Sequence, residues 1–301
     1  MSQPLPKFSA PLVPTHRSDV YDRIDSSSTL SSAATSVTGV LVTGSGRGVG
    51  RSTAVAFARA GAKKLVLTSR TKAELEEVKK EIEGLGKGTE VRIVEVDLTK
   101  EESVDHLFKE AGEIDVLVNN AGYLEPCVSI RDSKPADWIR TQDINTTGTY
   151  LATRAFLRQM PSNAGDNGKK YTVINTSSIG SVGTRPGFSG YQPGKTLINR
   201  FSEFLHFEEP SVRTFAIHPG GVMTKLAKDS MPPDTHGMLS DTPELAANFS
   251  LWLATDEKAD FLRGKYVSAN WDIEELLAKK DEILEKDLLW TRVVGQEQIM
   301  K

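Results

Sequence analysis

The chain has 301 residues, a formal net charge of −3, a pI near 6.0 and a single cysteine, Cys127. This length suits one large α/β domain with a sizeable core, and the nearly balanced charge offers no general attraction to nucleic acid or to an anionic membrane. A single cysteine excludes an internal disulfide and fits a reducing compartment, so we expect a cytoplasmic protein. No apolar run reaches the roughly 18 residues that a membrane-spanning helix needs.

The first 38 residues differ in composition from the rest of the chain. They are rich in Ser, Pro and Thr and lack the apolar centre of a secretory signal. The serine-rich run at 26–36 is typical of a tether or surface arm rather than of a core element. We therefore assign residues 1–38 to an N-terminal arm and residues 39–301 to a single domain.

From residue 40 onward, short apolar strands alternate with helices. This alternation predicts an α/β protein with a single-domain Rossmann fold, in which a doubly wound, seven-stranded parallel sheet carries helices on both faces. A charged helical tail at 272–286 should pack one apolar stripe on the body or on a partner subunit. The predicted strands are 40–42, 65–68, 91–96, 114–118, 171–174, 212–217 and 266–267, and the helices are 52–60, 72–82, 101–111, 137–160 (divisible at Gly148), 191–207 and 243–254.

A glycine-rich loop, TGSGRGVG, joins the first strand to the first helix. Glycines at this point let the backbone turn tightly and approach a pyrophosphate that rests on the helix N-terminus. A glycine-rich loop alone is weak, but between a strand and a helix of an alternating chain it predicts a dinucleotide site. The residues assigned to this site are Gly44, Ser45, Arg47, Gly48, Val49 and Gly50.

The end of the second strand bears on the choice of dinucleotide. An NAD site would carry an acid here for the ribose 2′-hydroxyl, whereas this chain has Ser69 and Arg70. A guanidinium binds phosphate bidentately, so Arg70, together with Arg47, favours NADP(H) over NAD(H). The alternative is that both arginines are solvated surface residues.

The third and fourth strands end in residues suited to the adenine. Asp97, followed by Leu98, can accept a hydrogen bond from the adenine amino group. Small residues after the fourth strand leave room for the adenine side of the cofactor. Asn119 is as well suited to stabilising its strand as to touching a ligand. The residues assigned after the fourth strand are Asn120, Ala121 and Gly122.

Tyr191 and Lys195 share a helix face, and Ser178 precedes the tyrosine by thirteen residues. A phenol with a pKa of about 10 is a poor proton donor and acceptor at neutral pH, so we expect the neighbouring ammonium to lower that pKa. Pro193 lies between the two and is tolerated only in a first turn, so the helix should begin close to Tyr191. Gly194 removes a side chain and leaves room for close packing.

These motifs, in this order and spacing, resemble the short-chain dehydrogenase/reductase family over residues 40–270. The resemblance implies an oxidoreductase that interconverts a ketone and a secondary alcohol, with Tyr191 as general acid and base. Ser178 would hold the substrate oxygen, and Lys195 would bind the nicotinamide ribose. Asn145 would order a water between Lys195 and solvent, and no metal is implied. The turn after the sixth strand would contact the nicotinamide through Pro219, Gly220, Val222 and Thr224.

Other interpretations stay open at this point. Ser177 is the rival of Ser178, but the thirteen-residue interval favours the latter. His206 and His218 could suggest a Ser–His hydrolase, yet a GxSxG motif is absent from the sequence and structural histidines are the better interpretation. The same scaffold could instead serve a redox-neutral isomerase or cyclase, or a nucleotide-binding sensor without enzymatic activity.

Substrate choice should depend on loops over the carboxyl edge of the sheet, at 123–130, 180–188 and 222–241. The last of these resembles a lid and is rich in Met, Leu and Pro, which suits an apolar substrate or simply packs the lid on the body. The arm and the segment 267–272 are similar to those of a fungal subgroup, many of whose members act in secondary metabolism. The family often forms dimers or tetramers through its two long helices, so a homo-oligomer is expected.

Overall fold

The computed structural model describes residues 12–165 and 168–293 of the chain. Its strands are β1 (Val40–Thr43), β2 (Lys64–Ser69), β3 (Glu90–Glu95), β4 (Val116–Asn119), β5 (Tyr171–Thr176), β6 (Val212–His218) and β7 (Tyr266–Ser268). They form one parallel sheet in the order β3-β2-β1-β4-β5-β6-β7. The predicted doubly wound fold is thereby confirmed. The direction of winding reverses between β1 and β4, which is where such folds bind ligands.

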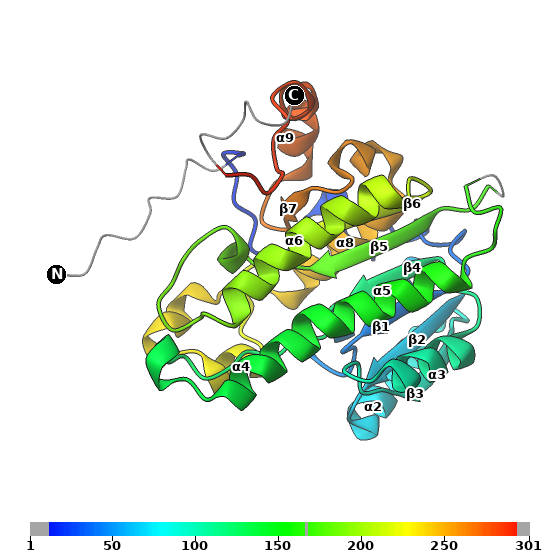
Figure 1. Ribbon diagram of the computed structural model, residues 1–301. Coiled ribbons are helices and arrows are strands. Elements are labelled where there is room, and N and C mark those ends of the chain that lie inside the picture. The colour runs from blue at the N-terminus through cyan, green and yellow to red at the C-terminus, as the bar shows by residue number, and fades with distance from the viewer. Residues whose placement is uncertain (1–11, 166–167, 294–301) are drawn as a thin grey trace.

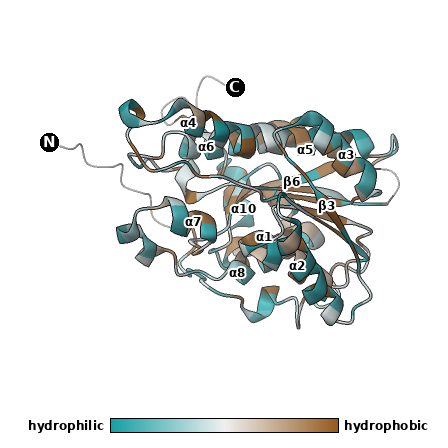
Figure 2. Ribbon diagram, turned by 90° about the horizontal axis from the view of Figure 1, so that it is seen from below, coloured by the Kyte–Doolittle hydropathy of each residue, from teal (hydrophilic) through white to brown (hydrophobic). Residues whose placement is uncertain are grey.

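Helices cover both faces of this sheet. The α-helices are α1 (Gly48–Arg59), α2 (Lys72–Gly84), α3 (Glu101–Ala111), α4 (Pro135–Gln142), α5 (Gly148–Gln159), α6 (Tyr191–Glu208), α7 (Lys225–Ser230), α8 (Pro243–Thr255), α9 (Ile273–Ala278) and α10 (Lys280–Glu285). Figure 2 shows α3, α4, α5 and α6 on one face, with α1, α2 and α8 on the other. Within the described residues, no helix is both long enough and apolar enough to cross a membrane.

Short helical segments complete the fold between these elements. Five are 3-10 turns, and one is a π-helical segment that separates α4 from α5. The predicted helix at 137–160 is therefore divided, and its second part begins at Gly148 as the sequence allowed. The segments are η1 (Asp22–Ile24), η2 (Ile130–Asp132), the π segment η3 (Asp143–Thr147), η4 (Ile179–Ser181), η5 (Pro233–Met238) and η6 (Glu257–Leu262).

The core lies on both sides of the sheet, because successive residues of a strand point to opposite faces. In β1, Val40 and Val42 join the cluster beneath α1 and α8, whereas Leu41 joins the cluster beneath α3 and α5. All three side chains are fully buried. Two buried faces explain why the strands read as continuous apolar runs instead of alternating ones.

The N-terminal segment is not the surface arm that its composition predicts. Among its described residues, Val13, Ile24 and Ala34 are at most 2% exposed and belong to the core cluster under α1 and α8. Leu30 is buried there as well. The prediction failed because these few apolar residues are scattered among Ser, Thr and Asp, so that average composition hides the side that packs on the body.

Part of this segment binds the chain near its other end. The Arg17 amide donates to the Asn270 carbonyl at 2.8 Å, and its guanidinium reaches the Asp272 carboxylate at 2.7 Å. The Tyr21 hydroxyl accepts a hydrogen bond from the Ile273 amide at 3.0 Å. We call residues 15–21 together with 270–275 the clasp. In Figure 1 these blue and orange-red segments lie side by side.

The charged tail forms two helices, α9 and α10, that meet at Lys279. Its apolar stripe consists of Ile273, Leu276 and Ile283, all fully buried in the core of this same chain. The prediction of one apolar face is confirmed, and the body of the molecule is the surface that this face covers.

Candidate active site

A cavity of about 1320 Å³ opens at the carboxyl ends of the strands. Residues that follow β1 to β6 contribute to its walls, so segments far apart in the sequence meet at one edge of the sheet. The site residues predicted from the sequence that line it are Gly44, Arg47, Gly48, Val49, Ser69, Arg70, Asp97, Leu98, Asn120, Ala121, Gly122, Ser178, Tyr191, Lys195, Pro219, Gly220, Val222 and Thr224. Three others, Ser45, Gly50 and Asn145, are not among the residues that line it.

At Gly44 and Gly50 the glycine-rich loop passes so close to its neighbours that it has no room for a side chain. Gly44 has a φ of +66°, and a Cβ there would lie 2.9 Å from the Ala121 Cα. A Cβ on Gly50 would lie 2.4 Å from the Gly44 carbonyl oxygen. Only glycine satisfies both constraints. Gly44 therefore presents bare backbone to the cavity.

The N-terminus of α1 opens into the cavity with its amide groups available. Within the described residues, no side chain caps this helix. Uncapped amides at a helix N-terminus, together with the helix dipole, attract an anion. Asn120 holds the preceding loop in place, because its Nδ2 donates to the Thr43 carbonyl at 3.0 Å. The uncapped amides at the N-terminus of α1 fit the pyrophosphate of a dinucleotide.

Two polar residues near this loop stabilise the strands. The Ser45 hydroxyl accepts a hydrogen bond from the Thr68 amide at 2.8 Å and joins the loop to β2. Asn119 donates to Asn175 at 2.8 Å and to Thr153 at 3.0 Å. Of the two roles that the sequence left open for Asn119, the structure thus supports the strand-stabilising one.

The corner assigned to a ribose phosphate carries charges of both signs. Arg70 is exposed at the end of β2 and lines the cavity. Arg47 lines it too, but its guanidinium is 2.9 Å from the Glu74 carboxylate on α2. Glu74 also crowds Gly46, where a Cβ would lie 2.9 Å from its Oε2. The sequence reasoning missed this acid, which sits four residues beyond Arg70.

Asp97 is oriented by the residues that follow it. Its Oδ1 accepts hydrogen bonds from the Thr99 hydroxyl at 2.7 Å and from the Thr99 amide at 3.1 Å. The Thr99 hydroxyl, more than any other group, holds the pKa of this carboxyl below its usual value, and Lys100 and Arg70 add to the effect. A charged carboxylate therefore lines the cavity where the adenine was expected.

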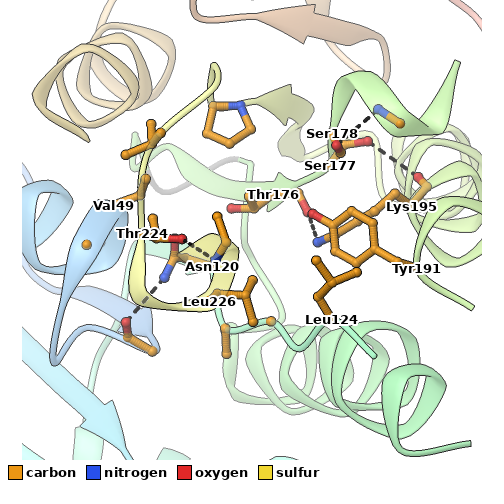
Figure 3. A pocket seen from close by; sticks show the side chains of 18 of the residues that line it. Val49, Asn120, Leu124, Thr176, Ser177, Ser178, Tyr191, Lys195, Thr224 and Leu226 are labelled. Atoms are coloured by element: carbon orange, nitrogen blue, oxygen red, sulfur yellow. Dashed lines mark hydrogen bonds between the residues drawn. The ribbon is translucent and has the colours of Figure 1, made fainter. Parts of the chain in front are cut away.

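Tyr191, Lys195 and Ser178 meet on the other side of the cavity. Tyr191 is the first residue of α6, as Pro193 predicted, and Ser178 caps η4 by accepting from the Gly180 amide at 3.0 Å. The Lys195 ammonium donates to the Thr176 carbonyl at 2.6 Å and lies 5.5 Å from the centre of the Tyr191 ring. Figure 3 shows these side chains facing Val49, Asn120 and Thr224 across the pocket.

Burial governs the proton affinities of this group. It raises the pKa of Tyr191; the hydrogen bond with Ser178 acts in the opposite direction, and the Glu125 charge raises the pKa further. Burial also lowers the pKa of Lys195 to about 8. The prediction that Lys195 lowers the pKa of Tyr191 is therefore wrong for this arrangement, because the ammonium is directed at Thr176 and is itself destabilised by burial.

The rivals considered for these roles have structural partners. The Ser177 hydroxyl donates to Asn199 at 2.6 Å inside the protein. His218 accepts the Ile179 amide on Nδ1 at 3.0 Å, and burial lowers its pKa to about 4. His206 packs against the Trp290 ring. None of these residues forms a Ser–His pair in the part of the chain that the structure describes.

Asn145 lies within the π segment and is 1% exposed. Its Oδ1 accepts the Tyr123 amide and its Nδ2 donates to the Tyr123 carbonyl, both at 2.7 Å. The side chain thereby ties the substrate loop after β4 to the helix. A π segment within an α-helix often marks a functional site, but hydrophobic periodicity gives no sign of it in the sequence.

One acid, Asp241, connects the two ends of the lid at 222–241. Asp241 accepts hydrogen bonds from the Gly221 amide at 2.6 Å and from Asn270 Nδ2 at 2.8 Å. His16, which belongs to the clasp, lies 3.9 Å from the same carboxylate and lines the cavity. Sequence reasoning assigned neither residue to the site. The apolar lid residues that line the cavity are Val222, Leu226, Ala227, Met231, Met238 and Leu239.

The fold and these side chains define an oxidoreductase site of the short-chain type, without a metal centre in the described residues. The profile of the short chain dehydrogenase family matches residues 38–234. The chain belongs to this family.

Relatives are found among fungal proteins. Short chain dehydrogenase citE of Monascus ruber is 41% identical over 264 residues, which cover 85% of this chain and 88% of the relative. Short chain dehydrogenase andI of Emericella variicolor is 32% identical over 261 residues, 83% of this chain and 87% of the relative. The structure of 3-ketoacyl-(acyl-carrier-protein) reductase from Brucella melitensis, complexed with NADH, is similar with a TM-score of 0.69 and 28% identity, over 77% of this chain and 96% of that one.

Proposed function

We propose that this protein is an NADP(H)-dependent oxidoreductase that interconverts a ketone and a secondary alcohol, with Tyr191 as the general acid and base. The observation that carries the proposal is the meeting of Tyr191, Ser178 and Lys195 at the wall of a cavity that also holds an open helix N-terminus. A proton donor thus stands within the same cavity as the site that fits a dinucleotide.

Each residue of the site has a separate role in the proposed reaction. When bound, the dinucleotide supplies a hydride to the substrate carbon in one direction and accepts it in the other. Tyr191 gives a proton to the carbonyl oxygen during reduction, and its raised pKa keeps that proton available. Ser178, whose hydroxyl already contacts the phenol, holds the same oxygen. Lys195 would hold the ribose of the bound dinucleotide.

The NADP(H) preference is supported by Arg70 and opposed by Glu74. Arg70 brings a cation to the end of β2, where an acid would serve NAD(H). Glu74 neutralises Arg47 and could accept from a ribose hydroxyl instead. We give more weight to Arg70, because its guanidinium forms no ion pair among the residues described and lines the cavity directly.

The part of the cavity lined by the lid and the neighbouring loops favours an apolar ketone as the substrate. Leu226, Met231 and Met238 of the lid, with Leu124 and Phe188, turn carbon atoms toward the cavity. The proposal includes a role in fungal secondary metabolism, and the similarity to short chain dehydrogenases of the fungi Monascus and Aspergillus is in keeping with a fungal origin. A panel of aromatic and aliphatic ketones, followed by loss of the NADPH absorbance, tests this choice; faster turnover of small polar ketones would contradict it.

Tyr191→Phe tests the catalytic assignment. The variant keeps the ring and removes only the hydroxyl, so kcat should fall by about 10²-fold to 10⁴-fold, while the Kd for NADPH changes by less than about twofold. The measurements are steady-state kinetics and fluorescence titration of the cofactor. Tyr150→Phe, on the exposed face of α5, is the matched control and should retain full activity. Retention of most activity by Tyr191→Phe would show that another group transfers the proton.

A further inference from the structure

A buried acid lies directly behind the catalytic tyrosine. Glu125 follows β4 in the loop after the Asn-Asn-Ala-Gly segment and is 4% exposed. Its Oε1 accepts the Gly190 amide at 2.8 Å and the Tyr191 amide at 3.0 Å. Its Oε2 accepts the Thr141 hydroxyl of α4 at 2.8 Å. An acid is rarely this deeply buried unless its oxygens have partners.

These contacts replace the cap that α6 lacks in its own sequence. The residue before the helix is Gly190, which has no side chain to satisfy the first amides. A Cβ at Gly190 would lie 2.7 Å from Glu125 Oε1, so the glycine makes room for the acid. Gln142 Nε2 donates to the Gly190 carbonyl at 2.7 Å and holds the other side of the same peptide.

We propose that Glu125 is a positioning residue for Tyr191: it caps the first turn of α6 and places a negative charge next to the backbone of the catalytic tyrosine. This inference rests on the proposed function of Tyr191. The carboxylate accepts the amide of the catalytic residue itself, so it holds the backbone that carries the phenol. A negative charge at the N-terminus also complements the dipole of the 18-residue helix.

The charged and titratable groups around Tyr191 come from three elements. Glu125 lies on the loop after β4, Ser178 on the loop after β5, and Lys195 one turn further along α6. Glu125 disfavours the phenolate, the Ser178 hydroxyl favours it, and Lys195 is directed at Thr176. His218 faces Ile179 and is neutral near pH 7. Glu125 is therefore the negative charge whose removal should change the titration of Tyr191.

Glu125→Gln separates charge from geometry. The glutamine oxygen can still accept both amides of α6, and its NH₂ group can donate to Thr141. In the direction of carbonyl reduction, activity falls as pH rises through the pKa of Tyr191. Removal of the charge lowers that pKa, so this alkaline limb of kcat/KM should move to lower pH by at least about half a unit. Glu102→Gln, an exposed acid on α3, should leave the limb in place.

Glu125→Ala removes the cap as well and should lower kcat more than about tenfold, with the NADPH Kd within about twofold of the wild type. An alkaline limb that stays in place in Glu125→Gln would overturn the role of the charge, and an unchanged kcat in Glu125→Ala would overturn the positioning. Should the wild type reduce no carbonyl compound, the proposed function fails first. The phenolate absorbance of Tyr191, taken as the difference from Tyr191→Phe, then reads the same shift without turnover.

Discussion

Single residues at the cavity differ in how strongly burial changes their chemistry. Burial lowers the pKa of Lys195 inside the protein, whereas the Arg70 guanidinium is exposed at the rim of the cavity. An exposed guanidinium gains little from any one partner in water, but a phosphate with two negative charges offers two parallel hydrogen bonds. We therefore expect the contribution of Arg70 to cofactor choice to appear only when the ligand is bound.

Arg70→Ala should raise the Kd for NADPH about tenfold or more, which corresponds to the loss of one charge-assisted hydrogen bond. The Kd for NADH should change less than about twofold. Fluorescence titration with both cofactors measures the two values. Lys80→Ala removes an exposed cation from α2 and controls for general electrostatics. Equal weakening of NADPH and NADH in Arg70→Ala would remove the 2′-phosphate assignment.

Among the elements, the end of β6 supports the segment that carries Ser178. His218, the last residue of β6, accepts the amide of Ile179, the first residue of η4. That acceptor exists only while Nδ1 carries no proton. Burial lowers the pKa of His218 from the usual 6.5 to about 4, so Nδ1 stays free to accept this hydrogen bond at neutral pH.

The link should make stability depend on pH. The native state binds a proton on His218 less readily than the unfolded chain, so its contribution is complete above about pH 6.5 and is lost as pH falls toward 4, a change of about 3 kcal/mol. Urea unfolding at pH 7.5 and at pH 5 measures it. His218→Gln keeps an acceptor that does not titrate and should lose less stability on acidification, whereas the exposed His106→Gln should match the wild type. An equal loss in all three proteins would contradict the assignment.

Prediction from the sequence worked where local signals decide structure. Tyr191 begins α6 because Pro193 fits only a first turn, and the apolar runs of β1 and β5 are long enough to identify buried strands. The cap of α6 could not be foreseen, because Glu125 reaches Tyr191 across 66 positions in the sequence. The π segment around Asn145 depends in the same way on contacts with Tyr123 that exist only in the folded protein.

At the scale of the whole molecule, the segment before β1 is part of the core. Ile24 is fully buried and packs with the cluster beneath α1 and α8. Side chains from opposite parts of the sequence thus share one hydrophobic interior. The stability of the sheet should therefore depend on residues outside the stretch, 38–234, that matches the family profile.

Ile24→Ala should lower the free energy of unfolding by about 2–5 kcal/mol, because it removes buried carbon and leaves a cavity. Thr29→Ala, at an exposed position in the same segment, should change it by less than about 0.5 kcal/mol. Both follow from denaturant unfolding monitored by tryptophan fluorescence. Equal stability of Ile24→Ala and the wild type would mean that the segment can leave the body without cost.

The clasp bears on the order in which parts of the active site form during folding. Arg17 and Asp272 are 255 positions apart, so their contact closes a very long loop. Such closure is entropically unfavourable until the intervening sheet has brought the ends together. The Asn270 side chain donates a hydrogen bond to the Arg17 carbonyl and another to the Asp241 carboxylate at the base of the lid. We therefore expect this wall of the cavity to be completed late in folding, after the sheet has formed.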